Sequence, residues 1–426
     1  MRYIVCIVFF TVLMATTVHA QNIRVREHLR PMFEFDHVGD FENGLAVVFR
    51  GSEVAVVDVN CEFVIPFRFD PRFFRDVGFS DGFIALYDAE TSRFGYYNAH
   101  GEQVIDYRFV DARPFSEGLA AVRLDTVQWG FIDIVGDVVI PPAFLDARGL
   151  REGLAAVFHS KGWGFVDSDG NMVVYPEYSH VSDFEDGFAT VYVWETQQFG
   201  FIDTYGNNIA WFEYLPPGVW VYPMELPRFS DGLITFSLAM DDGQVLFGYM
   251  DTTGNVVISP MFNFTTRFSD GRAIVWVDER AGIIDISGDL VMLPVEMDRR
   301  IAPFSEGRAA FTVGEWPNET VGFLDVYGNE IIAPVFMQAR DFSEGLAAVR
   351  TDDGWGFIDK YGNIVVATRF DAVTNFSEGF AWFLQDGRWG TLEIYERSVV
   401  MPVILSVFGV AVVAALWVFK RMGARL

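Results

Sequence analysis

Short apolar segments alternate with polar turns along most of the chain, and the same order of segments returns at intervals of about 34 to 45 residues. In the copy at residues 115–142, a Phe-Ser-Glu-Gly turn precedes apolar residues 119–123, and a polar loop leads to Trp-Gly-Phe-Ile-Asp at 129–133. The first segment is too short for a stable helix, and alternate residues of the second fall on opposite faces of a strand. A third segment, at residues 138–140, ends at two prolines, which cannot donate to a β-ladder. Each copy therefore predicts three short strands.

A Phe-x-x-Gly turn, with Leu150 in place of Phe in one copy, marks each of ten copies, with its glycine at Gly44, Gly82, Gly118, Gly153, Gly187, Gly232, Gly271, Gly307, Gly345 and Gly379. Glycine tolerates the positive φ that tight turns require, and serine hydrogen-bonds locally to the backbone. A period in this range is typical of solenoids, propellers and related arrays. Because the copies fill nearly the whole chain, we expect one repeat domain rather than several separate domains.

A second turn begins with aspartate and ends with glycine, as at Asp133 and Gly136. It recurs with its aspartate at Asp167, Asp203, Asp251, Asp285, Asp325 and Asp359. Aspartate at the first position accepts hydrogen bonds from nearby backbone N–H groups, which explains its presence without a metal. Asp167-Ser168-Asp169-Gly170 resembles the start of a calcium loop, but the other ligands of such a loop are absent. We expect no metal site, while weak Ca²⁺ binding by the acidic surface stays open.

The Trp-Gly pair lies in the middle of the second predicted strand. A glycine inside a strand indicates close approach by another group, and we expect Gly130 to make room for an aromatic ring of a neighbouring unit. Aromatic residues make up 16% of the chain, more than a surface needs, so these tryptophans are expected in a core between units rather than in sugar-stacking positions.

The fold class that follows is all-β: an array of about ten three-stranded antiparallel repeats, either propeller-like or a curved β-solenoid. Propellers usually have about 4 to 8 blades, so ten units could form a wide ring, two smaller rings or an open superhelix. The repeat pattern does not decide between ring closure and an open solenoid.

The pattern Phe-Ser-Glu-Gly-Leu-Ala-Ala-Val, followed by Trp-Gly-Phe-Ile-Asp-x-x-Gly and Val-Ile-x-Pro, resembles the bacterial WG-repeat (KWG) proteins over about residues 33–395. Several copies depart from the pattern and replace the tryptophan by Phe94, Phe199, Phe247, Ala281 or Val321. Degenerate units are expected at the ends of an array, where they act as caps. The resemblance implies a repeat scaffold without a common assigned activity.

The two ends of the chain differ from the repeats. Residues 1–20 combine Arg2, an apolar run and a Val-His-Ala ending, which predicts a secretory signal peptide. Residues 399–419 are apolar enough for one transmembrane helix, and the basic tail 420–426 predicts a cytoplasmic C-terminus. Residues 21–398 are then an extracytoplasmic repeat domain of a single-pass protein in the cell membrane. Removal of the signal peptide would leave Cys61 without a partner for an intrachain disulfide.

The net charge of the chain disfavours some classes of binding partner. The formal net charge is −27, and such a surface repels nucleic acids and anionic headgroups. Gly78-Phe79-Ser80-Asp81-Gly82 matches the nucleophile elbow of hydrolases, but a strand rather than a helix is expected after it. We find no cofactor motif and assign no catalytic residue. Partners are expected to be neutral, cationic or metal-bridged.

An insertion separates the fifth and sixth units and contains several Trp and Tyr residues together with prolines. It is interpreted either as an ordered surface loop, as a break between two five-unit halves, or as a binding rim for carbohydrate or peptide. The residues of this possible rim are Trp211, Tyr214, Trp220 and Tyr222.

Together these features favour a non-catalytic, membrane-anchored extracytoplasmic scaffold that binds a protein or a glycan. One alternative is an envelope glycosidase-like enzyme that uses two acids across a ring opening. Another is a ligand-sensing subunit that acts through a separate membrane signalling protein. Acids that depart from the repeat pattern and face one cleft would favour the enzyme.

Overall fold

The structure, a computed structural model, describes residues 20–69, 79–124, 127–196, 198–213, 228–240, 243–278, 280–294 and 300–400. These residues form β-strands joined by turns, and none of them is helical. The chain divides into a large compact unit, Arg26–Glu393, and a second unit made of its two ends, Met1–Val25 and Ile394–Leu426. The predicted signal peptide lies outside the described residues up to position 19, and so does the predicted membrane span beyond Val400.

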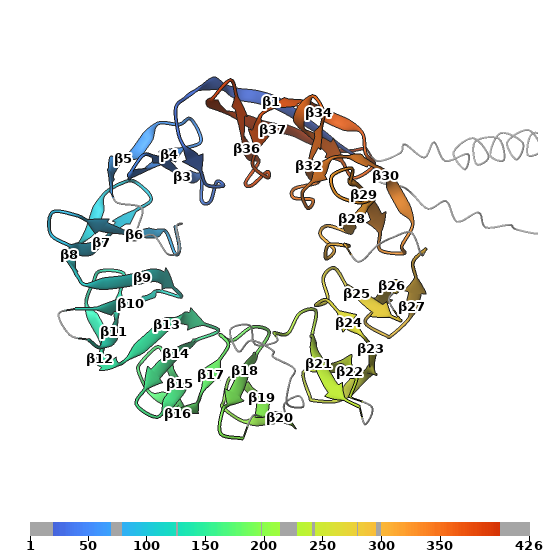
Figure 1. Cartoon of the computed structure of the whole chain (residues 1–426). Coiled ribbons are helices and arrows are strands. Elements are labelled where there is room, and N and C mark those ends of the chain that lie inside the picture. Colours follow the sequence, from blue (N-terminus) through green and yellow to red (C-terminus); the bar gives the residue numbers. More distant parts are fainter. Residues whose placement is uncertain are drawn as a thin grey trace, which may run out of the picture. The chain divides into compact units, whose positions relative to one another are not determined.

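The large unit is a ten-bladed β-propeller in which each blade is a small antiparallel sheet (Figure 1). Among the described strands, seven blades have four strands and three blades have three. The prediction of three-stranded units is therefore wrong for seven blades. Their additional inner strand is often only two residues long, as in β31 (Gln338–Ala339), which is too short to leave an alternating pattern in the sequence.

Blades are numbered here along the chain, and each contains consecutive strands. Blade 1 contains β2 (His37–Val38), β3 (Leu45–Arg50), β4 (Glu53–Asp58) and β5 (Phe63–Phe69), and blade 2 contains β6 (Phe83–Asp88), β7 (Arg93–Asn98) and β8 (Gln103–Phe109). Blade 3 contains β9 (Asp111–Ser116), β10 (Leu119–Arg123), β11 (Trp129–Asp133) and β12 (Val138–Phe144), and blade 4 contains β13 (Asp146–Arg151), β14 (Leu154–His159), β15 (Gly162–Asp167) and β16 (Met172–Tyr178). Blade 5 contains β17 (His180–Val181), β18 (Phe188–Val193), β19 (Gln198–Asp203) and β20 (Asn208–Glu213).

Blades 6 to 10 follow the same order. Blade 6 contains β21 (Leu233–Ala239), β22 (Val245–Asp251) and β23 (Val256–Phe262), and blade 7 contains β24 (Phe264–Thr265), β25 (Arg272–Val277), β26 (Arg280–Asp285) and β27 (Leu290–Met292). Blade 8 contains β28 (Arg308–Val313), β29 (Thr320–Asp325) and β30 (Glu330–Phe336), and blade 9 contains β31, β32 (Leu346–Thr351), β33 (Gly354–Asp359) and β34 (Ile364–Phe370). Blade 10 contains β35 (Ala372–Val373), β36 (Phe380–Gln385), β37 (Arg388–Val400) and β1 (Ala20–Phe33).

The last blade closes the ring. Its outer strand is β1, from the start of the chain, which pairs with β37 from the end (Figure 1). Trp389 of β37 donates its indole N–H to the carbonyl of Phe35 over 3.0 Å, and Arg26 forms an ion pair with Glu393 at 2.8 Å. The propeller-like alternative of the sequence prediction is therefore confirmed, and the open solenoid is not observed.

The glycines Gly130, Gly164 and Gly356 of three Trp-Gly pairs each face a β-bulge. Gly130 pairs with Val122 on one side, while the register shift between Trp129 and Phe131 on the other side brings the backbone of β12 across it. A Cβ atom at Gly130 would lie 2.5 Å from the carbonyl oxygen of Ile140. The expected close approach is present, but the expectation that an aromatic ring makes it is wrong. The neighbouring strand of the same blade occupies this space.

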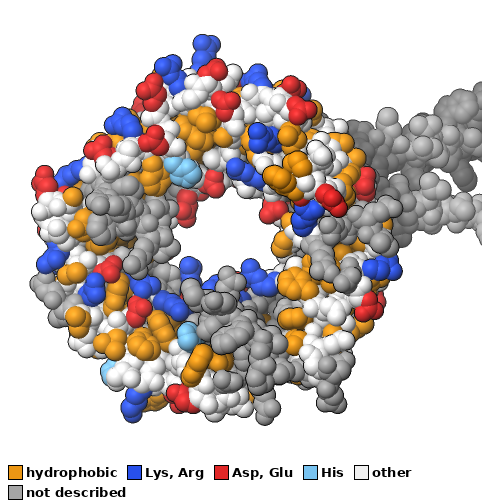
Figure 2. All heavy atoms as spheres, in the orientation of Figure 1, with side chains coloured by type: hydrophobic (Ala, Val, Ile, Leu, Met, Phe, Trp, Pro, Cys, Tyr) orange, Lys and Arg blue, Asp and Glu red, His pale blue; other side chains and the backbone are white. Residues whose placement is uncertain are grey.

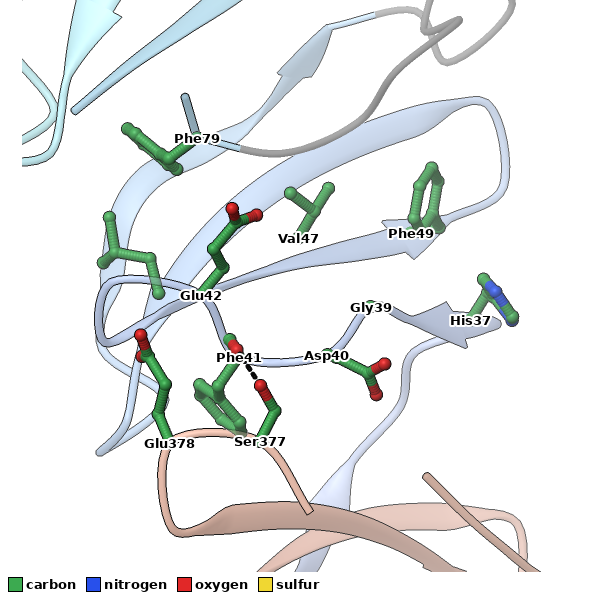
Figure 3. A pocket seen from close by; sticks show the side chains of 11 residues that line it. His37, Gly39, Asp40, Phe41, Glu42, Val47, Phe49, Phe79, Ser377 and Glu378 are labelled. Atoms are coloured by element: carbon green, nitrogen blue, oxygen red, sulfur yellow. Dashed lines mark hydrogen bonds between the residues drawn. The ribbon is translucent and has the colours of Figure 1, made fainter. Parts of the chain in front are cut away.

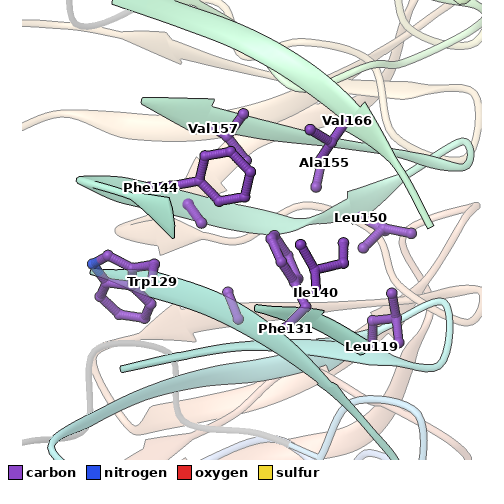
Figure 4. Packing of buried hydrophobic residues seen from close by; sticks show 11 residues of the cluster. Leu119, Trp129, Phe131, Ile140, Phe144, Leu150, Ala155, Val157 and Val166 are labelled. Atoms are coloured by element: carbon purple, nitrogen blue, oxygen red, sulfur yellow. The ribbon is translucent and has the colours of Figure 1, made fainter. Parts of the chain in front are cut away.

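Apolar side chains pack between adjacent blades. Figure 4 shows one such cluster, in which Trp129, Phe131 and Phe144 of blade 3 lie against Ala155 and Val157 of blade 4. The same packing joins the last blade to the first, where Trp382 stacks on Phe41 with ring centroids 5.2 Å apart. The prediction that the aromatic residues form cores between units agrees with these clusters. Polar and charged side chains cover much of the outer surface and the edge of the central opening (Figure 2).

Candidate functional site

The repeat turns, of which Phe-Ser-Glu-Gly is the typical form, link most blades to the next. In blade 3 the hydroxyl of Ser116 donates to the carbonyl of Leu150 over 2.5 Å. The carboxylate of Glu117 accepts from the backbone N–H groups of Glu152 and Gly153, both over 2.7 Å. Glu117 and Gly118 have φ of 53° and 83°, so the turn holds the acid in a left-handed conformation that residues with side chains rarely adopt. We call this pair of contacts the inter-blade clasp.

The clasp recurs around the ring. The serine contact joins Ser230 to Phe268, Ser269 to Phe304, Ser305 to Phe342, Ser343 to Phe376 and Ser377 to Phe41. The acid contact joins Asp81 to Gly118, Glu152 to Gly187, Asp231 to Gly271, Asp270 to Gly307, Glu306 to Gly345, Glu344 to Gly379, and Glu378 to Asn43 and Gly44. The repeated serines and acids therefore hold blades together.

Sequence reasoning interpreted these residues only as turn formers and missed their role between blades. The available signal was that serine and an acid recur together at fixed positions, although a turn of this type needs only the glycine and a residue that tolerates positive φ. Glutamate, unlike aspartate, is uncommon at positive φ, so the recurrence of glutamate at this position indicates a second task.

The aspartates of the second turn also bind backbone, as predicted. Asp203 accepts from the N–H groups of Tyr205 at 2.9 Å and Asn207 at 2.8 Å through one carboxylate oxygen. The donors follow Asp203 by two and four positions along the chain. The hydrogen bonds therefore extend one residue beyond the four-residue turn that ends at Gly206. Burial alone would raise the pKa of Asp203, but the hydrogen bonds from Asn207 and Tyr205 lower it below its ordinary value.

The first blade departs from the clasp. Its turn has Glu42 where most blades have serine, and Asn43 where the others have an acid. Glu42 does not make the serine contact, and the carbonyl of Phe79 in blade 2 receives no hydrogen bond from any described residue. Within the described parts of the chain, the clasp is likewise not formed between blades 5 and 6, where Glu185 replaces the serine.

A pocket of about 590 Å³ lies at this departure, where blades 10, 1 and 2 meet (Figure 3). Its lining residues are His37, Gly39, Asp40, Phe41, Glu42, Leu45, Val47, Phe49, Phe79, Ser377 and Glu378. Phe41, Leu45, Val47 and Phe79 are buried side chains that form apolar walls. Asp40 lies on the side that also carries His37 and Phe49, whereas Glu42 points towards Val47 and Phe79 (Figure 3).

The three carboxylates of the pocket differ in their bonding. Both oxygens of Glu378 accept backbone N–H groups, at 2.8 Å from Asn43 and 2.6 Å from Gly44. The side chains of Asp40 and Glu42 are exposed and have no hydrogen-bond or ion-pair partner among the residues that the structure describes. The pocket therefore presents two carboxylates that the protein itself does not neutralise.

The equivalent acid at another junction is neutralised. Asp183 directly precedes the blade 5 turn, as Asp40 directly precedes the blade 1 turn. Arg148 of the preceding blade donates to Asp183 at 3.2 Å, and its guanidinium lies 4.6 Å from the ring centre of Trp163. The position of Arg148 is occupied in blade 10 by Thr374, which has no charge.

The possible rim predicted from the sequence is described only in part. Trp211 lies on β20, the outer strand of blade 5, where it is 39% exposed and its ring centre is 6.3 Å from that of Tyr178. Tyr214, Trp220 and Tyr222 lie outside the described residues. The rim stays a prediction, and Trp211 is remote in sequence from all residues that line the pocket.

The described residues contain no group of three or more His, Cys, Asp or Glu side chains placed to hold a metal ion. They also contain no helix of the length and hydropathy needed to cross a membrane. Ser80, of the nucleophile-elbow match, pairs with Phe83 across the repeat turn, and strand β6 follows it.

Structural similarity is broad but weak. The chain is similar to a crystal structure of a eukaryotic initiation factor, with 12% identity, a TM-score of 0.44, and 78% of this chain and 89% of the other covered. It is also similar to Hsv2 of Kluyveromyces lactis, with 12% identity, a TM-score of 0.31, and coverage of 76% and 98%. No curated protein matches the sequence significantly. These likenesses carry no argument about function.

A family model gives the more specific result. The model described as WG containing repeat matches seven segments, at residues 33–52, 94–125, 129–159, 163–193, 247–279, 322–355 and 355–389. The segments extend from blade 1 to blade 10 and together cover half of the chain. They include seven of the ten repeat turns and the Trp-Gly pairs at residues 129–130, 163–164 and 355–356. The chain therefore belongs to the family of proteins built from WG-containing repeats.

Proposed function

We propose that the protein is a non-catalytic binding scaffold, displayed outside the cytoplasm and anchored by its apolar C-terminal segment at residues 399–419. The repeat β-propeller supports the scaffold part of this proposal, because its repeated polar residues serve the clasps and turns. The signal-peptide pattern at residues 1–20 and the basic tail at 420–426 support the location.

One observation carries the proposal. The carboxylates of Glu117 and its counterparts accept hydrogen bonds from the backbone of the next blade. The carboxylates of Asp40 and Glu42 line a pocket and have no hydrogen-bond or ion-pair partner among the described residues. Residues that depart from a repeat pattern and face a concave site are the usual place for ligand contacts on a repeat scaffold. The pocket at the ring closure is therefore the proposed binding site.

The runner-up is a glycosidase, and the same two acids are the observation that favours it. Such enzymes place a pair of carboxyl groups on either side of the scissile bond, in an environment that keeps one of them protonated. Asp40 and Glu42 are both exposed, so neither lies in the desolvated environment that the proton donor of such an enzyme needs.

Binding and turnover can be separated directly. The full chain in detergent is screened against immobilised peptides and glycans, and each bound compound is recovered and analysed by mass spectrometry. Saturable binding with unchanged compound is expected. Recovery of cleaved glycan, lost in a Glu42→Gln variant, would favour the glycosidase. Absence of saturable binding to either class would contradict the scaffold.

A further inference from the structure

We infer that the pocket at the ring closure binds an arginine side chain presented by a protein partner, with Asp40 as its main acceptor. This inference rests on the proposed scaffold function and selects a basic protein segment over a glycan. It adds to that function a ligand chemistry and the residues that would recognise it.

The first argument is a comparison within the molecule. At the junction of blades 4 and 5, Arg148 places a guanidinium between the Asp183 carboxylate at 3.2 Å and the Trp163 ring at 4.6 Å. A planar guanidinium can donate to a carboxylate and stack on an aromatic face at the same time. This junction shows that an acid directly before the clasp turn can hold a guanidinium against an aromatic ring.

At the ring closure the acceptor is present but the cation is not. Asp40 occupies the position of Asp183, and Thr374 occupies that of Arg148. His37 and Phe49, whose ring centres are 5.7 Å apart, lie on the same side of the pocket as Asp40 (Figure 3). An arginine from outside would supply the missing charge and could stack on these rings.

The other lining groups of the pocket can contact the methylene groups and the remaining donors of an arginine side chain. Beyond Asp40, the pocket has the buried apolar side chains of Leu45, Val47 and Phe79, which can contact the methylene groups of an arginine. The Glu42 carboxylate and the Phe79 carbonyl are further acceptors without donors in the described structure. The Asp40 carboxylate, the Glu42 carboxylate and the Phe79 carbonyl are all acceptors, so a donor-rich cation is the complementary chemistry.

The chain offers a variant that fills the site from within. Thr374→Arg would place in blade 10 the residue that blade 4 has at the same position. The Thr374 hydroxyl accepts from the backbone N–H of Trp382 and donates to the carbonyl of Asn375, both over 3.0 Å, so this variant loses two hydrogen bonds and its melting temperature must be checked. If the inference holds, the internal arginine competes with an external one.

Binding is measured by interferometry on the full chain in nanodiscs of phosphatidylcholine. The probe is a biotinylated Gly-Ser-Arg-Ser-Gly peptide, compared with the same peptide carrying lysine or neutral citrulline. We expect the arginine peptide to bind most tightly and the citrulline peptide to bind at least about tenfold more weakly, since the charge is lost and the shape is kept. Asp40→Asn and Thr374→Arg should each weaken the arginine peptide by a similar factor.

A charge-matched control separates the pocket from the acidic surface as a whole. Asp352→Asn with Asp353→Asn removes two charges from the turn between β32 and β33, and Asp40→Asn with Glu42→Gln removes two from the pocket. Only the pocket pair should weaken binding. Equal losses in both pairs, or equal affinity for arginine and citrulline, would overturn the inference. A protein that binds a glycan but ignores all three peptides would keep the scaffold function and reject the arginine site.

Discussion

The hydroxyl of Ser377, in the last blade, donates a 2.7 Å hydrogen bond to the carbonyl of Phe41, in the first. Residues separated by almost the whole repeat region thus form the same contact that Ser343 forms with Phe376 between neighbouring blades. The closing junction is built by the repeat motif itself, and Glu378 completes the clasp through Asn43 and Gly44.

Ring closure can be tested through this serine. Ser377→Ala removes one hydrogen bond from a part-buried carbonyl and should lower the free energy of unfolding by about 1 kcal/mol. Ser343→Ala, at an internal junction, should cost about the same, because the contact is equivalent. Chemical denaturation of both variants checks this. A clear loss for Ser343→Ala with none for Ser377→Ala would indicate an open array in solution.

The Trp-Gly glycine should tolerate no side chain. At Gly356 an added Cβ would lie 2.5 Å from the carbonyl oxygen of Val366 and 2.7 Å from the N of Thr368, both backbone atoms. Gly356→Ala therefore forces the bulge of β34 to move, and we expect a loss of several kcal/mol, within the upper range of single substitutions.

The control for this prediction is Gly39→Ala. Its φ is outside the positive region and its added Cβ would lie 3.4 Å from the carbonyl oxygen of Val47, an ordinary contact. The melting temperature should fall much more for Gly356→Ala than for Gly39→Ala. Similar shifts would show that the bulge is not a fixed feature of the blade.

The sequence predicted much of the blade and little of the ring. The alternation in Trp129–Asp133 and the Asp-x-x-Gly turns placed strands and hairpins correctly, because those signals are local. Closure depends on contacts such as Ser377 with Phe41, and the local pattern is the same in an open array. Inner strands such as β31 were missed because two residues carry no periodicity.

The pocket was less predictable than the fold. Glu42 and Asn43 stand out as departures from the Ser-Glu pattern only when the clasp is known, and the first unit is one in which degeneracy is expected anyway. Asp40 and Asp183 occupy the same place before their turns, but only the structure shows that Arg148 contacts Asp183, because no spacing along the chain indicates this contact. The aromatic insertion attracted attention instead because its composition differs from the repeats.

The proposed orientation in the membrane has its own test. Lys420 and Arg421 directly follow the apolar segment and predict that the C-terminus is cytoplasmic. An epitope added after Leu426 should resist protease added to intact cells and become sensitive after the membrane is permeabilised. Digestion of the epitope in intact cells would contradict the orientation and with it the extracytoplasmic placement of the propeller.

Cys61 should be unreactive in the folded protein. Its side chain is only 6% exposed, and burial, with a smaller contribution from Asp58, raises the pKa of its thiol to about 12. The thiolate is the reactive form, so alkylation at pH 8 should be slow until the protein unfolds. Iodoacetamide labelling followed by mass spectrometry, with and without guanidinium chloride, checks this. Rapid labelling of native Cys61 would show that blade 1 opens readily.

The turn aspartates are predicted to hold backbone rather than metal. Asp203→Asn keeps an acceptor oxygen for the N–H groups of Tyr205 and Asn207 and should cost clearly less than Asp203→Ala at pH 7. Asp203→Ala removes both contacts and should cost on the order of 1 kcal/mol. Thermal melts with Ca²⁺ and with a chelator provide the control. A calcium stabilisation of wild type that the Asn variant lacks would instead indicate a metal site at this turn.

The same aspartate predicts a dependence on pH. Hydrogen bonds from Asn207 and Tyr205 outweigh burial and lower the pKa of Asp203 below its ordinary value of 3.8. A group whose pKa is lower in the folded state stabilises the fold above the unfolded pKa, and this stabilisation is lost as the pH falls through the folded pKa. The melting temperature of wild type should therefore fall more steeply below about pH 4 than that of Asp203→Asn, which has no proton to bind there. The melting temperatures of the two proteins are compared from about pH 5 to about pH 2, a range that includes the ordinary pKa of aspartate. If the two curves are parallel, the ionised form of Asp203 contributes nothing to the stability of the turn.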